Sequence, residues 1–144
     1  MFPSEAKILI VDDSNFARNA LKSSLRELQY WKIAEAAEAK NAKALLYESE
    51  ADPVHLLIAD IHMPDMSGLQ LLEWVRGQEK TKDLPVIMLT SSQEKSEILA
   101  AGKLGISHYI IKPFDTAGLK EKITSTWQKH GQKYWESVRR RTAG

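Results

Sequence analysis

The sequence predicts an α/β fold in which a strand followed by a helix recurs five times, (βα)5. Short apolar runs alternate along the chain with segments whose apolar residues recur at helical spacing. Each run is apolar at consecutive positions, as in Ile8-Leu9-Ile10-Val11, which is typical of strands buried on both faces of a parallel sheet. Right-handed crossovers between parallel strands place helices on both faces, so we expect a doubly wound sheet.

The five predicted strands are short. Pro85 fits the first residue of the fourth strand, where its missing N–H is tolerated. The second run, after Trp31, gives the weakest signal of the five. The strands are expected over residues 7–11, 31–36, 55–59, 85–89 and 108–111.

The helices between the strands have recognisable ends. Ser14 can cap the first helix, Gly105 can end the fourth, and Gly131 is expected to stop the last one. The helices are expected from Ser14 to residue 28 and over residues 39–49, 67–78, 95–104 and 116–130. Residues expected to pack inward include Leu21, Leu25, Ala42, Leu45 and Leu46, and the tryptophans Trp31, Trp74 and Trp127.

Length and composition favour one globular domain. The chain has 144 residues, of which 43% are apolar and 27% charged. We expect a domain over residues 1–130, followed by a C-terminal tail or linker stub, 131–144, that contains Arg139-Arg140-Arg141. The net charge of +1 does not indicate a nucleic-acid partner.

The composition also excludes several kinds of site. The chain has no cysteine, which rules out disulfides and thiolate metal sites. No run approaches the roughly 20 apolar residues of a membrane span, and the first residues lack the apolar core of a signal peptide. We therefore expect a cytoplasmic protein without a membrane span.

Polar side chains end four of the five apolar runs. The pair Asp12-Asp13 follows the first run, Asp60 closes the third, Thr90 follows the fourth, and Lys112 follows the fifth. The carboxyl ends of parallel strands meet at one edge of the sheet, where open α/β sheets place ligands and chemistry. Acids, a hydroxyl and an ammonium at one edge would suit a divalent cation together with a phosphoryl group.

Each of these residues also has a plainer interpretation. The Asp12-Asp13 pair could be a helix cap and a solvated neighbour, Thr90 a turn residue, and Lys112 a surface lysine. Three clustered carboxylates, however, repel by about 4 kcal/mol per pair at 4 Å and an effective dielectric constant near 20. Such a cluster needs a cation, protonation or a nearby lysine. Oxygen ligands favour Mg²⁺ over zinc, and Asp60 could be either a metal ligand or a nucleophile.

Four motifs together carry a family resemblance. They are ILIVDDS at residues 8–14, DIHMPDMSG at 60–68, LTS at 89–91 and YIIKPF at 109–114. With these motifs in this order at strand ends, the chain resembles the CheY-like receiver domains of two-component response regulators over about residues 5–130. The resemblance implies a flavodoxin-like sheet with strand order 2-1-3-4-5.

The resemblance also implies a role for each strand-end residue. Asp60 would be the phosphoacceptor, Thr90 and Lys112 would bind phosphoryl oxygens, and the Lys112-Pro113 peptide bond would be cis. The ligands of Mg²⁺ would be Asp13, Asp60 and the backbone carbonyl of His62, with Asp12 assisting. In the family, the positions of His62 and Ser92 vary and tune the lifetime of the phosphoryl group.

The resemblance further implies a switch that a partner protein detects. Thr90 would move toward the phosphoryl group, and Tyr109 would turn inward. The output face would be formed by the fourth helix, the fifth strand and the fifth helix, and would carry Lys95, Ile98, Tyr109, Ile111 and Lys122. Implied partners are a histidine kinase or phosphotransfer protein, and a downstream protein or output domain. The protein would be a monomer or a phosphorylation-linked dimer.

Two other functions remain open at this point. Phosphohydrolases of the haloacid dehalogenase type also use an Asp nucleophile and Mg²⁺, but they need Asp-x-Asp after the first strand, whereas His62 stands two residues after Asp60. A receiver-like module that no longer takes phosphate would carry the same fold. In the favoured interpretation the protein is not a metabolic enzyme, and it catalyses only its own phosphorylation and dephosphorylation.

Overall fold

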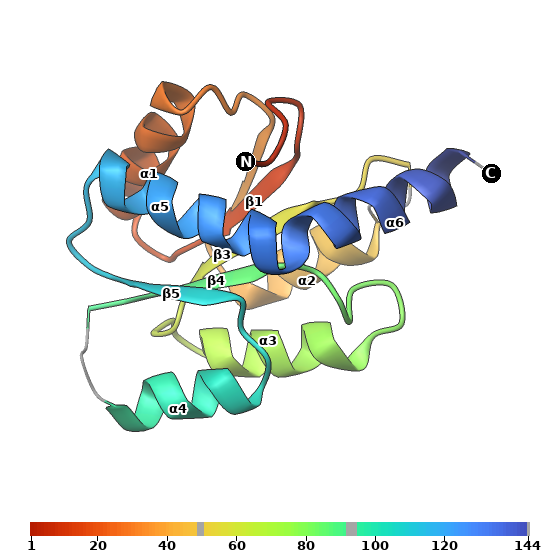
Figure 1. Cartoon of the computed structure of the whole chain (residues 1–144). Coiled ribbons are helices and arrows are strands. Elements are labelled where there is room, and N and C mark those ends of the chain that lie inside the picture. Colours follow the sequence, from red (N-terminus) through yellow and green to blue (C-terminus); the bar gives the residue numbers. More distant parts are fainter. Residues whose placement is uncertain (49–50, 92–94, 144) are drawn as a thin grey trace.

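The computed structural model describes residues 1–48, 51–91 and 95–143, so the expected helix end at Ser49, the tuning position Ser92 and the terminal Gly144 lie outside the described part. The sheet has five parallel strands in the order β2-β1-β3-β4-β5, which confirms the predicted topology (Figure 1). The strands are β1 (Ile8–Val11), β2 (Ile33–Ala36), β3 (Leu56–Asp60), β4 (Val86–Thr90) and β5 (His108–Ile111).

Helices follow every strand, with ends close to those expected. The Ser14 hydroxyl accepts a hydrogen bond from the Ala17 N–H, as its capping role requires. Ser67 and Gln70 form a reciprocal capping box at the start of α3. The helices are α1 (Asn15–Glu27), α2 (Ala39–Tyr47), α3 (Gly68–Gly77), α4 (Lys95–Lys103), α5 (Thr116–Thr126), the π-helical turn η1 (Trp127–Gly131) and α6 (Gln132–Ala143).

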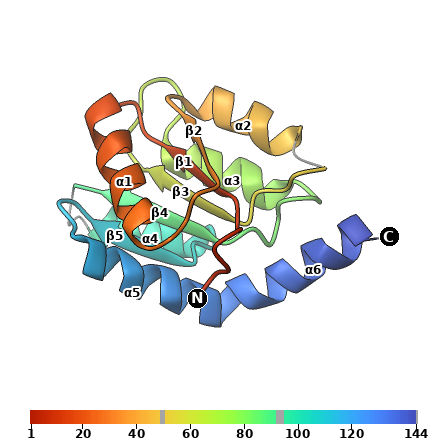
Figure 2. The same ribbon diagram turned by 90° about the horizontal axis from the view of Figure 1, so that it is seen from above.

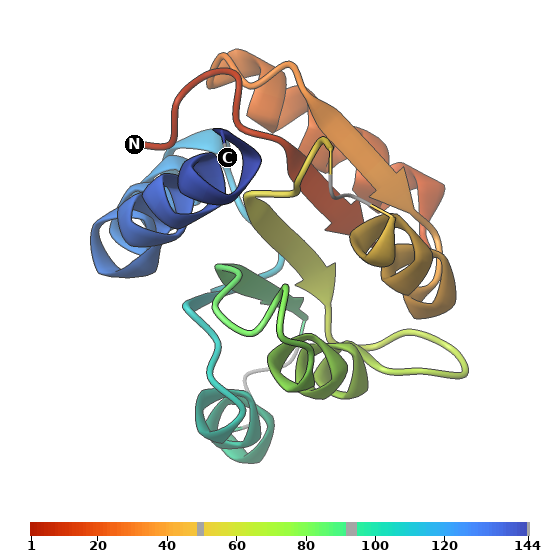
Figure 3. The ribbon, with the colours of Figure 1, turned by 90° about the vertical axis from the view of Figure 1, so that its right-hand side faces the viewer.

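Two apolar layers cover the two faces of the sheet. Alternate residues of β1 point to opposite sides, so that Leu9 and Val11 join one cluster while Ile8 and Ile10 join the other. The first cluster packs against α2 and α3, and the second packs against α1 and α5 (Figure 3). Burial on both faces explains why the strands read as continuous apolar runs.

The C-terminal segment departs from expectation. Gly131 does not end the last helix, because the chain continues through η1 into α6, and α5, η1 and α6 form one long helical run (Figure 2). Tyr134 and Val138, four residues apart on one face of α6, are buried in the core, so the helix continues onto apolar surface. The division of the chain at residue 130 stays a prediction, but α6 packs on the core rather than extending freely.

Close packing at Gly131 fixes the start of α6. A Cβ there would lie 2.5 Å from Cζ of Phe2. The Trp127 ring meets the Phe2 ring edge-on at 5.0 Å between centroids, and the Trp135 ring lies 4.4 Å from that of His55. The N-terminal segment and the helical run therefore hold each other against the sheet.

Two packing predictions are wrong. Trp31 is 67% exposed, and it precedes β2, which is the edge strand of the sheet in the described part of the chain. Leu45 is exposed, while its neighbour Leu46 takes the inward position on α2. Trp74 and Trp127 pack against the core as expected. Within the described residues, no helix has the length and apolar character needed to cross a bilayer.

Candidate functional site

Four strand ends bring the predicted site residues to one edge of the sheet. Asp12 directly follows β1, Asp60 ends β3, Thr90 ends β4 and Lys112 directly follows β5. The parallel register aligns these ends, pairing Val11 with Ala59, Asp60 with Leu89, and Thr90 with Ile111. Carboxylate oxygens of Asp12, Asp13 and Asp60 all lie within 4.8 Å of one another.

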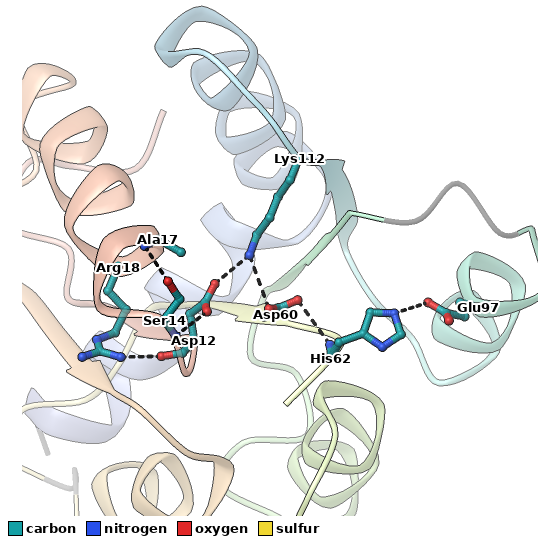
Figure 4. A network of polar contacts seen from close by, with 8 residues as sticks. All are labelled: Asp12, Ser14, Ala17, Arg18, Asp60, His62, Glu97 and Lys112. Atoms are coloured by element: carbon teal, nitrogen blue, oxygen red, sulfur yellow. Dashed lines mark hydrogen bonds and ion pairs between the residues drawn. The ribbon is translucent and has the colours of Figure 1, made fainter. Parts of the chain in front are cut away.

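Lys112 bridges two of the three acids. Its Nζ lies 2.8 Å from Oδ2 of Asp12 and 3.3 Å from Oδ2 of Asp60 (Figure 4). The predicted cis peptide bond between Lys112 and Pro113 is confirmed. Both carboxylates are buried, and the lysine side chain is 23% exposed, so the contacts lie in a partly water-excluded site. The ammonium therefore offsets part of the repulsion that the sequence implied.

The environment shifts the pKa values of Asp60 and Lys112 upward. Burial is the largest cause of the raised pKa of Asp60, and the charge of Asp12 adds to it, while Lys112 and the His62 N–H oppose it. Burial alone would lower the pKa of Lys112, but its hydrogen bond to Asp12 and the charges of both acids outweigh that effect and raise it. The lysine is therefore held in its charged form beside a carboxylate that is costly to ionise.

The loop after β3 fits tightly around Asp60. The His62 N–H donates to Oδ1 of Asp60 at 3.2 Å, and the Gly68 N–H donates to the Ile61 carbonyl at 2.8 Å. A Cβ on Gly68 would lie only 2.2 Å from the Asp60 carbonyl oxygen. Asp65 adopts a positive φ of 67° within the loop. Glycine at position 68 thus lets α3 start directly beneath the site.

Two residues, His62 and Arg18, make polar contacts at the site that were not predicted. His62 turns its ring away from Asp60, and its Nε2 lies 3.0 Å from Oε2 of Glu97 on α4 (Figure 4). Arg18 donates through Nη1 to the Asp12 carbonyl at 2.6 Å and through Nε to Glu35 at 2.9 Å. The first contact joins residues 35 apart in the sequence, and no local pattern marks it.

The predicted switch and output residues belong to β4, α4, β5 and α5. Thr90 is fully buried at the strand end, and Tyr109 is partly buried against the core cluster that faces α2 and α3. Nζ of Lys122 lies 5.7 Å from the centre of the Tyr109 ring, in cation–π range. Lys95 is exposed, while Ile98 and Ile111 are half-buried. Their roles in switching and output stay predictions.

The donor atoms suit a hard divalent cation. In the described part of the chain, Asp12, Asp13 and Asp60 are the one group of three or more candidate metal-ligating side chains that lie close enough to share an ion. Carboxylate oxygens are the ligands that Mg²⁺ takes, and two of these three side chains are buried. The set therefore fits Mg²⁺, and the part assigned to the His62 carbonyl stays a prediction.

Comparison with known proteins agrees with this geometry. Residues 8–124 match the family model described as the response regulator receiver domain. A chemotaxis protein CheY homolog of Campylobacter jejuni is 41% identical over 117 residues, which are 81% of this chain and 88% of the relative. Chemotaxis protein CheY of Pseudomonas aeruginosa is 38% identical over 123 residues, covering 85% of this chain and 97% of the relative.

Solved structures show the same likeness. A putative response regulator from Chloroflexus aurantiacus superposes with a TM-score of 0.80 at 29% identity, over 87% of this chain and 99% of that one. Chemotaxis protein CheY4 of Vibrio cholerae gives a TM-score of 0.76 at 27% identity, over 85% of this chain and 98% of that one. The fold, the strand-end residues and these matches lead to one assignment: the chain belongs to the receiver domain family of response regulators.

Proposed function

We propose that the protein is a phosphorylation-dependent signalling switch in which Asp60 accepts the phosphoryl group. One observation carries this proposal: three carboxylates from two strand ends lie within 4.8 Å of one another, with Lys112 bridging Asp12 and Asp60. A structural ion-pair network would not need the exposed Asp13 as a third acid. A site that binds a divalent cation needs several acids, because their negative charges balance the charge of the metal ion.

The proposed reaction transfers a phosphoryl group between two side chains. An Oδ atom of Asp60 attacks phosphorus, an O–P bond forms, and the P–N bond of a phosphohistidine donor breaks, so that its electron pair leaves with the donor imidazole. Bound Mg²⁺, held by Asp12, Asp13, Asp60 and the His62 carbonyl, would neutralise charge on the attacking and phosphoryl oxygens. Lys112 holds a phosphoryl oxygen through its ammonium, and Thr90 through its hydroxyl.

Phosphorylation would change the face formed by α4, β5 and α5. Thr90 and Tyr109 lie on adjacent strands, and Met88, two residues before Thr90, is the register partner of Tyr109. A shift of Thr90 toward the phosphoryl group would free space on the side where Tyr109 packs, and the equilibrium between two packings would move. Lys95 and Lys122 give this face a basic rim, which suits an acidic or amphipathic partner segment.

The proposed partners follow from the reaction. A histidine kinase or phosphotransfer protein would supply the phosphoryl group, and a downstream protein or output domain would bind the altered face. Chemistry confined to Asp60 means that no free metabolite is turned over. The expected cytoplasmic location and the choice between a monomer and a phosphorylation-linked dimer stay predictions.

The direction of the His62 side chain argues against a phosphohydrolase of the haloacid dehalogenase type. Such an enzyme needs a general acid two residues after its nucleophile. Here that position is His62, whose ring contacts Glu97 on α4 instead of approaching Asp60. His62 is then not placed to protonate a leaving alcohol.

Intact-mass spectrometry after incubation with acetyl phosphate tests the proposal. We expect one phosphoryl adduct on the wild type, dependent on Mg²⁺, absent in Asp60→Asn and retained in the matched loop variant Asp65→Asn. Beryllofluoride, a phosphoryl mimic, should shift the amide resonances of the same site in the wild type. Absence of both the adduct and the resonance shift would leave the phosphate-independent module as the function.

A further inference from the structure

A second charged pocket lies near the amino-terminal ends of β4 and β5, whereas Asp60 lies at the carboxyl end of β3. It has a volume of about 400 Å³ and is lined by residues of α3, η1 and α6 and of the segments before β4 and β5. In Figure 1, α6 lies at the right of the view, beside the loop that joins α3 to β4. Its cationic and histidine side chains are Arg76, Lys82, Lys129, His130, Lys133 and Arg140, and Asp83 is the one acid that lines it.

Arg76 forms a fixed positive base for this pocket. Its Nε and Nη2 donate to the Gly105 carbonyl at 3.0 and 2.7 Å, and its Nη1 donates to the Leu84 carbonyl at 2.7 Å. These partners are neutral, so they orient the guanidinium without cancelling its charge. Burial is the larger influence on the pKa of Arg76 and lowers it, while the charge of Asp83 raises it.

Three further cations approach from one helical run. Lys133 and Arg140 lie seven residues apart on α6, two turns along one face, and Lys129 lies on η1 one turn earlier. Within residues 1–48, 51–91 and 95–143, none of the three forms an ion pair with a carboxylate, and all are exposed. These three cations and Arg76 on α3 repel one another, and a bound anion would relieve that repulsion.

Both burial and the neighbouring positive charges lower the pKa of His130. Burial is the largest cause of its lowered pKa, and the charges of Arg76 and Lys129 lower it further. A neutral imidazole in such a place can donate to an anion through one ring nitrogen. An anion bound beside it would favour its protonated form.

We propose that this pocket binds a small phosphate-bearing anion with at least two negative charges, such as a diphosphate or a nucleotide. The volume falls within the usual range of small-molecule sites, about 300–1,000 Å³. Lysine and arginine are the common phosphate-binding side chains. Arg76 on α3 and Lys82 before β4 face the cations of the helical run across the pocket, an arrangement that suits a small anion better than a long polyanion. The inference does not depend on phosphorylation of Asp60.

Titration calorimetry of the full chain with inorganic diphosphate, and separately with ADP, tests the proposal in metal-free buffer at physiological salt. We expect saturable binding of one ligand per chain. The double variant Lys133→Ala/Arg140→Ala should weaken it about tenfold or more. The control Arg26→Ala/Lys40→Ala, which removes the same two residue types from exposed positions on α1 and α2, should not. Asp83→Asn should strengthen binding.

An NMR titration gives an independent readout. Diphosphate should raise the pKa of His130, assigned through His130→Gln, and should leave the ring resonances of His62, beside Asp60, in place. Equal binding of diphosphate and ADP would assign recognition to phosphate alone, and preference for ADP would assign a nucleotide. Three results would overturn the proposal: no saturable binding, equal losses in both double variants, or binding only of a long polyanion such as heparin.

Discussion

Lys112 lies closer to Asp12 than to Asp60, with Nζ–Oδ2 distances of 2.8 and 3.3 Å. The phosphoacceptor candidate therefore shares its ammonium with a neighbour that is more deeply buried, 2% exposed against 8%. In the absence of metal, and within the part of the chain that the structure describes, Lys112 is the one cationic residue that forms ion pairs with these two carboxylates. The stability of the metal-free protein should depend on this residue.

Lys112→Met should lower the free energy of unfolding by about 2 kcal/mol in EDTA. Removing one partner of a buried ion pair costs about 3–5 kcal/mol, and the 23% exposure of the lysine side chain reduces that cost through solvent screening. Urea unfolding measures it. Lys120→Met, which removes an exposed lysine on α5, is the control and should change little. Equal stability of Lys112→Met and wild type would show that the acids need no cation.

Asp13→Asn should act in the opposite direction. Asp13 is the exposed member of the acid cluster and makes no ion pair with a described residue, so its charge adds repulsion without a compensating contact. Neutralising it should raise metal-free stability by about 0.5–1 kcal/mol at the reduced strength of a solvent-exposed pair. Mg²⁺ should raise the melting temperature of the wild type and should do so less in the variant. If metal-free Asp13→Asn is less stable than the metal-free wild type, the repulsion argument is wrong. Glu73→Gln on α3 is the control for the loss of one exposed acid.

Gly68→Ala should disrupt the site through its backbone. The new Cβ would lie 2.2 Å from the Asp60 carbonyl oxygen and 2.8 Å from the Ile61 Cα, and backbone atoms cannot move aside cheaply. We expect a loss of about 3 kcal/mol or more, together with loss of the phosphoryl adduct. Gly102→Ala is the matched control, because nothing lies within 4 Å of its Cβ. That change within α4 should stabilise the protein by about 0.5–1 kcal/mol.

The sequence was sufficient for the strand ends but not for the contacts between distant elements. Asp60 and Lys112 were predictable because each directly follows or ends a buried apolar run, and parallel strands align such ends. The contact of His62 with Glu97 could not be predicted, because it depends on where α4 packs in the fold, and no local sequence pattern indicates that position. The prediction that Gly131 ends the last helix was wrong. Glycine can adopt the left-handed conformation that ends many helices but does not have to, and burial of Tyr134 and Val138 in the core favours continuation of the helix.

His55 makes the stability of the protein depend on pH. Burial first, then the charge of Lys32, lowers its pKa from 6.5 to about 4, and its Nδ1 accepts the Lys7 N–H. The unfolded chain therefore binds the proton more readily, so the contribution of neutral His55 is complete above pH 6.5 and is lost as pH falls toward 4. By linkage, about 3 kcal/mol is lost across that window. His55→Asn keeps a hydrogen-bond acceptor but removes the titrating group, so it should reduce the difference between the unfolding free energies measured in urea at pH 7 and pH 4.5. An unchanged difference would assign the acid sensitivity to other groups.

Val138→Ala tests whether α6 is part of the folded domain. Val138 is 2% exposed and packs in the core cluster that also contains Val54 and Leu84, although it lies beyond the residues that match the family. Deleting two buried methyl groups should cost about 2 kcal/mol. Gln132→Ala, at an exposed position of the same helix, should change little. If both variants unfold with the wild-type midpoint, then α6 contributes nothing to stability. A loss confined to Val138→Ala means that the packing of α6 contributes to the stability of the folded domain, so a ligand held by Lys133 and Arg140 on α6 would stabilise the helical run that ends the proposed output face.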